Sequence, residues 1–179
     1  MINWIGAHGA PYKIFKISSI TLIIGLISFL ISDHFFSLPL PSEKNDFARV
    51  VVDEHGRPLR AFADSNGVWR YQTKVQDVST EYIEALLHYE DRWFYYHPGI
   101  NPLSLLRASI QNIFAGRIIS GGSTLTMQVA RTFDPHERSY SGKLQQAFRA
   151  LQLEWHFSKE QILNFYLNYV PFGGPVEGV

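Results

Sequence analysis

The 179-residue sequence contains no cysteine, so neither a disulfide nor a cysteine-ligated metal centre can form in it. It also lacks an excess of charge of either sign, because 16 lysines and arginines balance 16 aspartates and glutamates. The total charge therefore points to no partner, and nothing in it indicates nucleic acid. No internal repeat or low-complexity segment occurs, and a hydrophobic content of 46% excludes a mainly disordered chain.

Motifs for two common kinds of site are missing as well. The seven histidines form no HExxH or similar ligand spacing, and the GxxxxGK[ST] nucleotide loop is absent. A Ser-His-Asp triad stays open on spacing alone, but no residue points to one. The sequence therefore predicts no metal ligands and requires no cofactor. We expect His97 to be a hydrogen-bonding partner near Glu90 rather than a zinc ligand.

The most conspicuous feature that is present is an apolar run near the N-terminus. Residues 17–32 carry no charge, Lys13 and Lys16 precede them, and Asp33 follows. With the lysines reaching towards the headgroups, the segment attains the length of about 20 residues that spans a bilayer. Basic residues on its N-terminal side place the N-terminus in the cytoplasm. We predict a cytoplasmic segment over 1–13, an uncleaved transmembrane signal anchor over 14–36 and a linker over 37–47; a cleaved signal peptide is the alternative.

Short β patterns follow the linker. Ala48–Val52 and Leu59–Phe62 are predicted to pair across the turn that begins at Asp53, and Val68–Tyr71 is predicted as a third strand after Asn66-Gly67. This small sheet would pack between the membrane and the rest of the chain.

From Ser79 onward the pattern is helical, so the body is predicted to be mainly α. Ser79 can cap a helix that reaches Glu90, and Ser158 opens a capping box for the last helix. Between them we expect helices over Pro102–Phe114, from Leu125 onward, and over Lys143–Trp155. The predicted apolar stripes of the first and third of these helices are Leu103, Leu106, Ile110 and Phe114, and Leu144, Phe148, Leu151 and Trp155.

Glu90 falls on an apolar helix face, seven residues after Ile83 and four before Phe94. A carboxylate in such a stripe is either paired with a cation or holds its proton more tightly, because burial disfavours the charged form. The second case suits a general base. The structural alternative is an ion pair or bridge to a nearby basic residue, namely Arg92, Arg107 or His97. Asp91 should serve the helix end or the turn through Pro98-Gly99.

Positive charge is concentrated between Arg107 and Arg149. This stretch holds six basic residues against two acids, which suggests an anionic ligand; a solvated helical face is the equal alternative. Within it, Gly121-Gly122-Ser123-Thr124 precedes a predicted helix, where backbone N–H groups and the helix dipole attract anions. A simple N-cap turn is the alternative interpretation of these four residues.

Three motifs now occur in order along the chain. They are Glu90-Asp91-Arg92-x-Phe94-x-x-His97-x-Gly99, then Gly121-Gly122-Ser123-Thr124-Leu125-Thr126-Met127-Gln128, then Lys159-x-x-Ile162-Leu163-x-x-Tyr166-Leu167-Asn168. Together they resemble the peptidoglycan glycosyltransferase domain of family 51, found in class A penicillin-binding proteins and monofunctional transglycosylases. The resemblance runs from about Val50 to the last residue and assigns residues 48–179 to this domain. It implies a lysozyme-like, mainly helical fold behind one N-terminal membrane helix.

The resemblance also implies a role for each matching position. Glu90 would be the general base that takes the proton from the 4-hydroxyl of the acceptor lipid II sugar, with inversion and release of polyprenyl diphosphate. The implied substrate and diphosphate contacts are Ser123, Thr124, Gln128, Arg131, Arg138, Lys143 and Gln146. The implied supporting residues are Asp91, Phe94, His97 and Gly99. A divalent cation, Mg²⁺ or Mn²⁺, could bridge the diphosphate, although no carboxylate cage for it is visible.

The sequence departs from the family pattern in the third motif. Where the family has Arg-Lys-x-x-Glu, this chain has Gly142-Lys143-Leu144-Gln145-Gln146. Gln146 replaces a glutamate, and an amide can orient a group but cannot ionise. Glu154, about two helical turns further on, is a candidate substitute. Met127 also replaces a glutamine, with the loss of a polar contact.

The chain ends inside the family's next motif region, and it has no SxxK, SxN and KTG set. We therefore expect a fragment without a transpeptidase domain. Three hypotheses stand: a membrane-anchored peptidoglycan glycosyltransferase, a remnant that binds lipid diphosphate without turnover, and, least favoured, a lytic glycosidase. The first implies lipid II, the growing glycan strand, inner-membrane lipid and other cell-wall synthesis proteins as partners. It places the catalytic body on the outer side of the bacterial cytoplasmic membrane.

Overall fold

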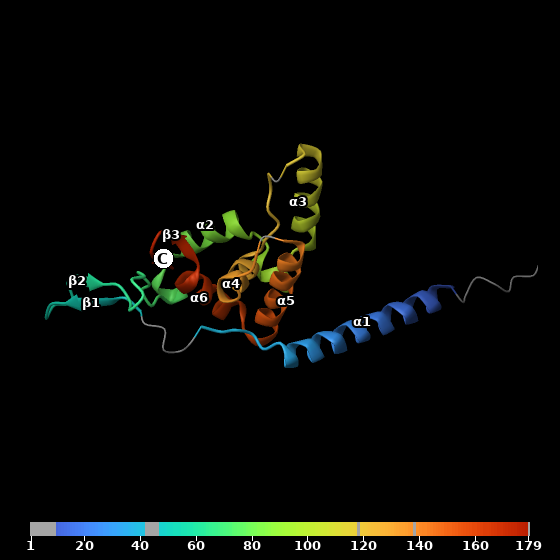
Figure 1. Cartoon of the computed structure of the whole chain (residues 1–179), viewed down its shortest axis with the longest axis horizontal. Helices are drawn as coiled ribbons and strands as arrows, with labels where there is room; N and C mark the ends of the chain where they lie inside the picture. Colours follow the sequence, from blue (N-terminus) through green and yellow to red (C-terminus); the bar gives the residue numbers. More distant parts are fainter. Residues whose placement is uncertain (1–9, 42–46, 118, 138, 179) are drawn as a thin grey trace, which may run out of the picture. The chain divides into compact units, whose positions relative to one another are not determined.

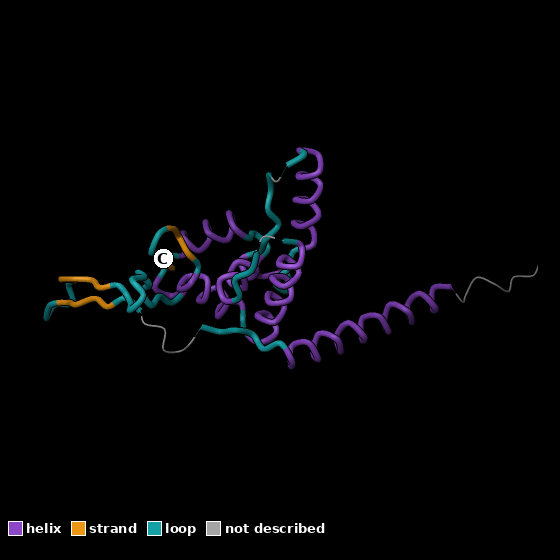
Figure 2. The backbone as a smooth tube through the Cα atoms, in the orientation of Figure 1, coloured by secondary structure: helices purple, strands orange, loops and turns teal. Residues whose placement is uncertain are grey.

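The computed structural model describes residues 10–41, 47–117, 119–137 and 139–178 (Figure 1). The chain divides into two units, Met1–Leu38 and Pro39–Val179. The described part is mainly helical, as predicted, with six α-helices and a few short strands (Figure 2).

The first unit is dominated by one long helix, α1 (Ala10–Phe35). Its segment Lys16–Phe35 has 20 residues and is long and apolar enough to cross a membrane. At a rise of about 1.5 Å per residue this segment extends about 30 Å, the thickness of a bilayer's hydrocarbon core. The helix is confirmed, whereas the boundaries 14–36, membrane insertion and orientation stay predictions.

The second unit begins with an antiparallel hairpin of β1 (Arg49–Val52) and β2 (Pro58–Phe62). Asp53 forms its turn, because the Oδ1 atom accepts hydrogen bonds from the backbone N–H groups of His55 at 2.9 Å and Arg57 at 2.8 Å. The predicted pair of strands is confirmed. Its residues are largely exposed, so the hairpin is not a packing layer within the described structure.

The predicted third strand over Val68–Tyr71 is wrong. Trp69 forms only an isolated bridge with Val176 of the short hairpin β3 (Pro171–Gly173) and β4 (Val176–Glu177). The Asn66-Gly67 turn does form, since Asp64 Oδ1 accepts from Val68 N at 2.7 Å. The segment after the turn therefore pairs with residues near the C-terminus and not with β2. Local alternation of apolar and polar residues cannot reveal such a long-range pairing.

Helices α2 (Thr80–Glu90) and α3 (Pro102–Ala115) follow, with the one-turn 3₁₀ helices η1 (Val75–Asp77) and η2 (Phe94–Tyr96). Ser79 caps α2 as predicted, through its side chain and Tyr82 N. Helix α3 has the predicted extent, but its apolar stripe is exposed, with Leu103 at 78% and Phe114 at 89%. Only Ala108 of α3 is buried.

The core is formed where α4 (Leu125–Phe133), α5 (Tyr140–His156) and α6 (Lys159–Tyr169) pack together (Figure 1). α4 is the central helix and buries five of its nine residues. The predicted capping box of α6 is confirmed, with Ser158 and Gln161 bonding each other's backbone.

The predicted stripe of α5 is wrong. Leu144 and Trp155 are 73% and 57% exposed, and Phe148 and Leu151 are only half-buried. The buried face instead consists of small and polar residues with one large apolar residue, Leu153; the others are Gly142, Gln146, Ala150 and Gln152. The apolar pattern does not predict the buried face of α5, because α4 packs close to α5 and only small side chains at the contact permit that approach.

Candidate active site

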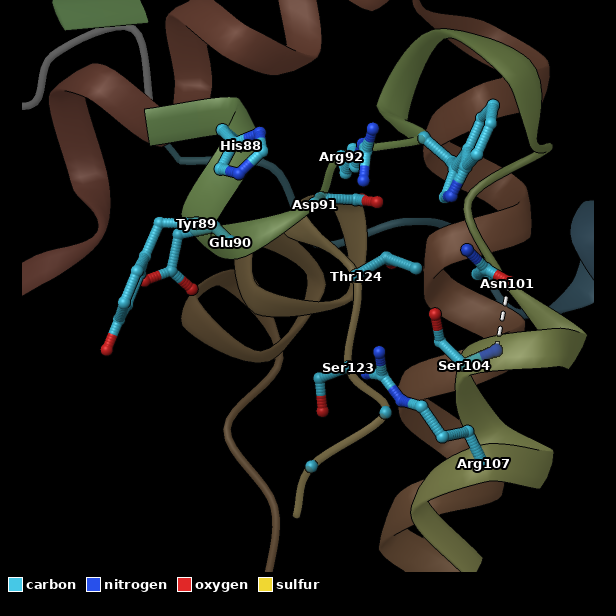
Figure 3. Close-up of a pocket in the computed structure, with 13 residues that line it drawn as sticks. His88, Tyr89, Glu90, Asp91, Arg92, Asn101, Ser104, Arg107, Ser123 and Thr124 are labelled. Atoms are coloured by element: carbon cyan, nitrogen blue, oxygen red, sulfur yellow. Dashed lines mark hydrogen bonds between the residues drawn. The ribbon is translucent and has the colours of Figure 1, made fainter. Parts of the chain in front are cut away.

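Glu90 is the last residue of α2 and lines a cavity of about 310 Å³ (Figure 3). Gln128 of α4 donates a hydrogen bond from Nε2 to Glu90 Oε2 at 2.8 Å. In the part of the chain that the structure describes, Glu90 has no ion pair. The alternative in which Arg92, Arg107 or His97 bridges Glu90 is therefore wrong, because α4 supplies a neutral partner and His97 is committed elsewhere.

Asp91 is the buried partner of His97. Its two carboxylate oxygens lie 2.9 and 3.1 Å from His97 Nε2, and Oδ2 also accepts from Leu125 N at 2.9 Å. The predicted role at a helix end is confirmed, since Asp91 is the C-cap residue of α2. The sequence did not reveal that the same carboxylate also holds the first turn of α4. Asp91 thus fixes α2 to α4 beside Glu90.

The other supporting residues anchor the loop after η2. Phe94 is fully buried, and the Lys159 ammonium lies 4.6 Å from its ring centre while donating to His97 O at 2.7 Å. Gly99 has φ +82°, and a Cβ on it would come within 2.8 Å of Ala150 O. Thr124 Oγ1 donates to Gly99 O at 2.5 Å, which fastens this loop to α4. Phe94, His97 and Gly99 position the site and do not line its cavity, whereas Thr124 does.

The loop over 121–124 forms one wall of the cavity. Thr124 is the N-cap of α4, because its Oγ1 accepts from Met127 N at 3.1 Å, so the N-cap interpretation is confirmed. Gly122 lets the loop pass close to α3, where an added Cβ would lie 2.9 Å from Leu105 Cα. Figure 3 shows Arg107 extending from α3 towards Ser123 on this wall.

Ser123 joins the cavity to a group of residues on α5. Its hydroxyl accepts a hydrogen bond from Lys143 Nζ at 2.5 Å, and Lys143 also donates to Gln146 Oε1 at 3.0 Å. Burial lowers the pKa of Lys143, and the nearby Arg131 charge lowers the pKa further. The Glu90 carboxylate and the Ser123 hydroxyl therefore line one cavity. The Lys143 ammonium is bound to Ser123, and its two described hydrogen-bond partners are neutral.

The remaining predicted residues are Arg131, Arg138 and Gln146, together with Glu154 as the candidate substitute for a glutamate at 146. Arg131 is exposed at the last turn of α4, near enough to act on Lys143. Arg138 lies outside the described residues. Gln146 is buried, with its Nε2 donating to Met127 O at 2.6 Å, so it does not face the cavity. Glu154 is not a substitute for a carboxylate at 146, because its Oε1 accepts from Thr126 Oγ1 at 2.6 Å and Lys159 Nζ at 2.8 Å.

Tyr166 of α6 belongs to the third sequence motif, but the sequence assigned it no role near Glu90. Burial, then the charge of Glu90, then Tyr82 raise the pKa of Tyr166 to about 12. Its phenol therefore stays protonated near Glu90. The i, i+3, i+4 pattern of α6 placed Tyr166 in the core, but only the packing of α6 against α4 reveals its proximity to the carboxylate.

Among the described residues, no group of three or more histidines, aspartates or glutamates could hold a metal ion. The side chains around Ser123 are hydroxyl, amide and cationic groups, whereas Mg²⁺ and Mn²⁺ prefer carboxylate and carbonyl oxygens. The described side chains that contact Ser123 therefore supply no carboxylate ligand for a divalent cation, and a cation at the diphosphate stays a prediction.

Comparison with known proteins assigns this chain to a family. A family model described as transglycosylase matches residues 55–179. Penicillin-binding protein 1C of Escherichia coli (strain K12) is 57% identical over 141 residues, which are 79% of this chain and 18% of that protein. Penicillin-binding protein 1A of Aquifex aeolicus (strain VF5) is 34% identical over 165 residues, 89% of this chain and 22% of that protein.

A third relative, penicillin-binding protein 1A of Pseudomonas aeruginosa, is 36% identical over 168 residues, again 89% of this chain and 20% of that protein. The chain thus spans about a fifth of the length of these curated relatives. The family match covers the cavity, the loop over 121–124 and all three core helices. The chain belongs to the transglycosylase family.

Proposed function

We propose that the chain is a peptidoglycan glycosyltransferase that joins lipid II units into glycan strands. The arrangement of Glu90 supports this most directly. Its carboxylate lines a cavity, a neutral amide holds it, and the loop that forms the opposite wall carries Ser123 in contact with the Lys143 cation. A base that lines a cavity, with a cation bonded to the hydroxyl of another lining residue, suits a transfer in which one oxygen loses a proton and another gains charge.

In the proposed reaction, Glu90 accepts the proton of the acceptor sugar's 4-hydroxyl while that oxygen bonds to C1 of the donor sugar. The bond from C1 to the diphosphate oxygen breaks with its electron pair, the configuration at C1 inverts, and polyprenyl diphosphate leaves. Glu90 can accept this proton because Gln128, its hydrogen-bond partner in the described structure, is uncharged. Tyr166 does not compete as a base, because its high pKa keeps the phenol protonated.

Lys143 and Arg131 are the proposed partners of the leaving diphosphate. Burial and mutual repulsion act against positive charge on Lys143, and an approaching anion would relieve both effects. Cations aimed at the developing charge of the leaving group stabilise the transition state more than the ground state. Arg138, Ser123, Thr124 and Gln128 stay proposed substrate contacts. The reaction as proposed needs no divalent metal ion held by the protein.

Two further hypotheses differ in what they require of the site. A lytic glycosidase generally uses two carboxylates that flank the scissile bond. Here the carboxylate next to Glu90 belongs to Asp91, which is buried and bound to His97 and Leu125 N. This arrangement disfavours hydrolysis. Binding without turnover remains the second candidate, since the amide of Gln146 replaces a charge that the resembled motif contains.

The proposed location follows from α1. We propose that this helix anchors the chain in the bacterial cytoplasmic membrane as a single span, with the N-terminus inside. The second unit would then meet lipid II and the glycan strand at the outer surface, together with other cell-wall synthesis proteins. The long apolar segment Lys16–Phe35, with Lys16 at its start and Lys13 before it, supports this orientation.

The test is to incubate the chain in detergent with fluorescent lipid II and separate the products. Polymer together with free polyprenyl diphosphate is the expected result. Cleavage of preformed glycan without any use of lipid II would contradict the proposal in favour of a lytic enzyme. Saturable binding of lipid II without polymer would select the remnant that binds lipid diphosphate without turnover.

A further inference from the structure

Gln146 lies between the core and Lys143, with both ends of its amide in use. Only 3% of the residue is exposed. Its Nε2 donates to Met127 O at 2.6 Å, and its Oε1 accepts from Lys143 Nζ at 3.0 Å. With so little surface, the amide cannot be a substrate contact of the kind that the sequence suggested. Its effect on a ligand has to pass through Lys143.

The two contacts require an amide. A carboxylate in the same orientation would place two oxygens with no proton between them at the Met127 contact. A carboxylate turned towards Lys143 would instead form an ion pair with the ammonium, which draws the cation away from any other anion. The neutral amide is thus the side chain that can hold Lys143 without cancelling its charge.

The other described neighbours of Lys143 leave the positive charge of its ammonium without an opposite charge beside it. Ser123 Oγ accepts from the ammonium and is neutral. Arg131, the charged neighbour that acts on Lys143, has the same sign. No acidic side chain in the described ranges forms an ion pair with Lys143. Lys143 thus has a like charge as its charged neighbour, and two neutral hydrogen-bond acceptors, Ser123 and Gln146, hold its ammonium next to a residue that lines the cavity.

We propose, on the basis of the proposed function, that Gln146 is a positioning residue. It fixes the Lys143 ammonium beside Ser123 and leaves Lys143 and Arg131 uncompensated, so that both are available to the diphosphate of the lipid substrate. The resembled motif balances its glutamate with an arginine, but this chain has Gly142 in the arginine's place, so a glutamate at 146 would neutralise Lys143 with no second cation from the motif to compensate.

The first test measures binding of a polyprenyl diphosphate to the full chain in detergent, with the matching polyprenyl alcohol as the neutral reference. We expect Gln146→Glu to weaken diphosphate binding at least tenfold and to leave alcohol binding unchanged. Gln146→Met keeps the volume but loses both hydrogen bonds, and should weaken diphosphate binding about two- to fivefold. Gln72→Glu adds the same charge at an exposed position and should behave as the parent.

A double-mutant cycle separates positioning from general damage. Lys143→Met should weaken diphosphate binding about tenfold in the parent and less than twofold in the Gln146→Glu chain. Equal losses in the two backgrounds, or parental affinity in Gln146→Glu, would overturn the proposal. If Gln146→Glu does not fold, the same comparison is made in Gln146→Met, where undiminished binding would overturn it.

A ligand-free measurement distinguishes failure of this inference from failure of the proposed function. Lysine side chains are labelled with ¹³C, and the Lys143 signal is assigned by its loss in Lys143→Met. Gln146→Glu should raise the pKa of Lys143 by about one unit or more, because an opposite charge then favours the ammonium. An unchanged titration contradicts the positioning role. Absence of diphosphate binding in the parent contradicts the proposed function alone.

Discussion

At the scale of single residues, the site depends on which polar side chains are buried and what each one binds. Asp91 and Glu90 are neighbours in sequence and both border the cavity, yet the Asp91 carboxylate is buried against His97 and Leu125 N, whereas Glu90 is half-buried and accepts from Gln128. The end of α2 between them turns the two carboxylates in different directions. One carboxylate holds helices together, and the other is left for chemistry.

Asp91→Asn should destabilise the chain by about 2 to 3 kcal/mol, because an amide cannot replace a carboxylate that accepts from both His97 and a backbone N–H. Urea unfolding in detergent, followed by circular dichroism, measures the change. Asp77→Asn is the matched control, since Asp77 is exposed and its bond to Lys74 N can be kept by an amide. Equal, small losses for the two variants would show that the Asp91 network contributes little.

At the scale of the elements, local capping chemistry was predictable and the pattern of burial was not. Ser79, Thr124 and Ser158 each cap a helix as the sequence indicates, because the cap and its partner N–H lie within three residues. The buried face of α5 could not be predicted, because it is set by the close approach of α4. Gly142 illustrates this: a Cβ there would lie 2.3 Å from Glu137 O, so the arginine of the resembled motif has no room.

The site was predictable to a similar extent. The motifs identified Glu90, Ser123 and Lys143; Glu90 and Ser123 line one cavity, and Lys143 bonds to Ser123. The motifs could not show that Gln146 is buried or that Tyr166 lies near Glu90, because both depend on how α4, α5 and α6 pack.

The loop that joins η2 to α3 depends on the glycine at 99. Gly99→Ala should cost about 2 to 4 kcal/mol, because the residue needs positive φ and a Cβ would meet Ala150 O and Glu154 Cγ, each at 2.8 Å. Gly56→Ala is the control with φ +77° and open space, and should cost only about 1 kcal/mol. Thermal unfolding of the two variants compares them. A Gly56 loss as large as the Gly99 loss would assign the whole effect to backbone conformation.

Helices α4 and α5 are also joined by Asp134, which accepts from Arg149 Nε at 2.6 Å and Gln145 Nε2 at 2.9 Å. Burial tends to raise the pKa of Asp134, but these hydrogen bonds and the charges of Arg149 and His136 outweigh it, so the pKa lies below its ordinary value of 3.8. Since the folded pKa is the lower one, this stabilisation is present above the unfolded pKa and is lost as the pH falls through the folded pKa.

Asp134→Asn should therefore lower the free energy of unfolding by about 0.5 to 1 kcal/mol at neutral pH, a value kept small because solvent screens the partly exposed pair. The difference between the variant and the parent should shrink as the pH falls from neutral through the folded pKa of Asp134, because the parent carboxylate then takes up a proton. Urea unfolding over a series of acidic pH values measures the difference. A constant difference across this range would rule out the charge of Asp134 as the cause.

At the scale of the whole molecule, the chain combines an apolar helix with a small helical body. The segment Lys16–Phe35 is expected to span the membrane, and Ile24 lies near its middle. A lysine at the centre of a spanning helix disfavours insertion by about 2.5 to 3.5 kcal/mol. Ile24→Lys should therefore move a measurable part of the chain from the alkali-resistant membrane fraction to the soluble fraction. Gln72→Lys, with the same charge change, should stay in the membrane. Unchanged extraction of Ile24→Lys would contradict a spanning α1.

The central claim is that Glu90 removes the proton from the acceptor sugar. The most direct measurement compares the rate of lipid II polymerisation by the parent, Glu90→Gln and Glu84→Gln, where Glu84 is an exposed glutamate on the same helix. We predict a loss of at least about a hundredfold in kcat for Glu90→Gln, with lipid II binding retained, and a parental rate for Glu84→Gln. Polymerisation by Glu90→Gln at the parental rate would contradict the assignment of Glu90 as the base.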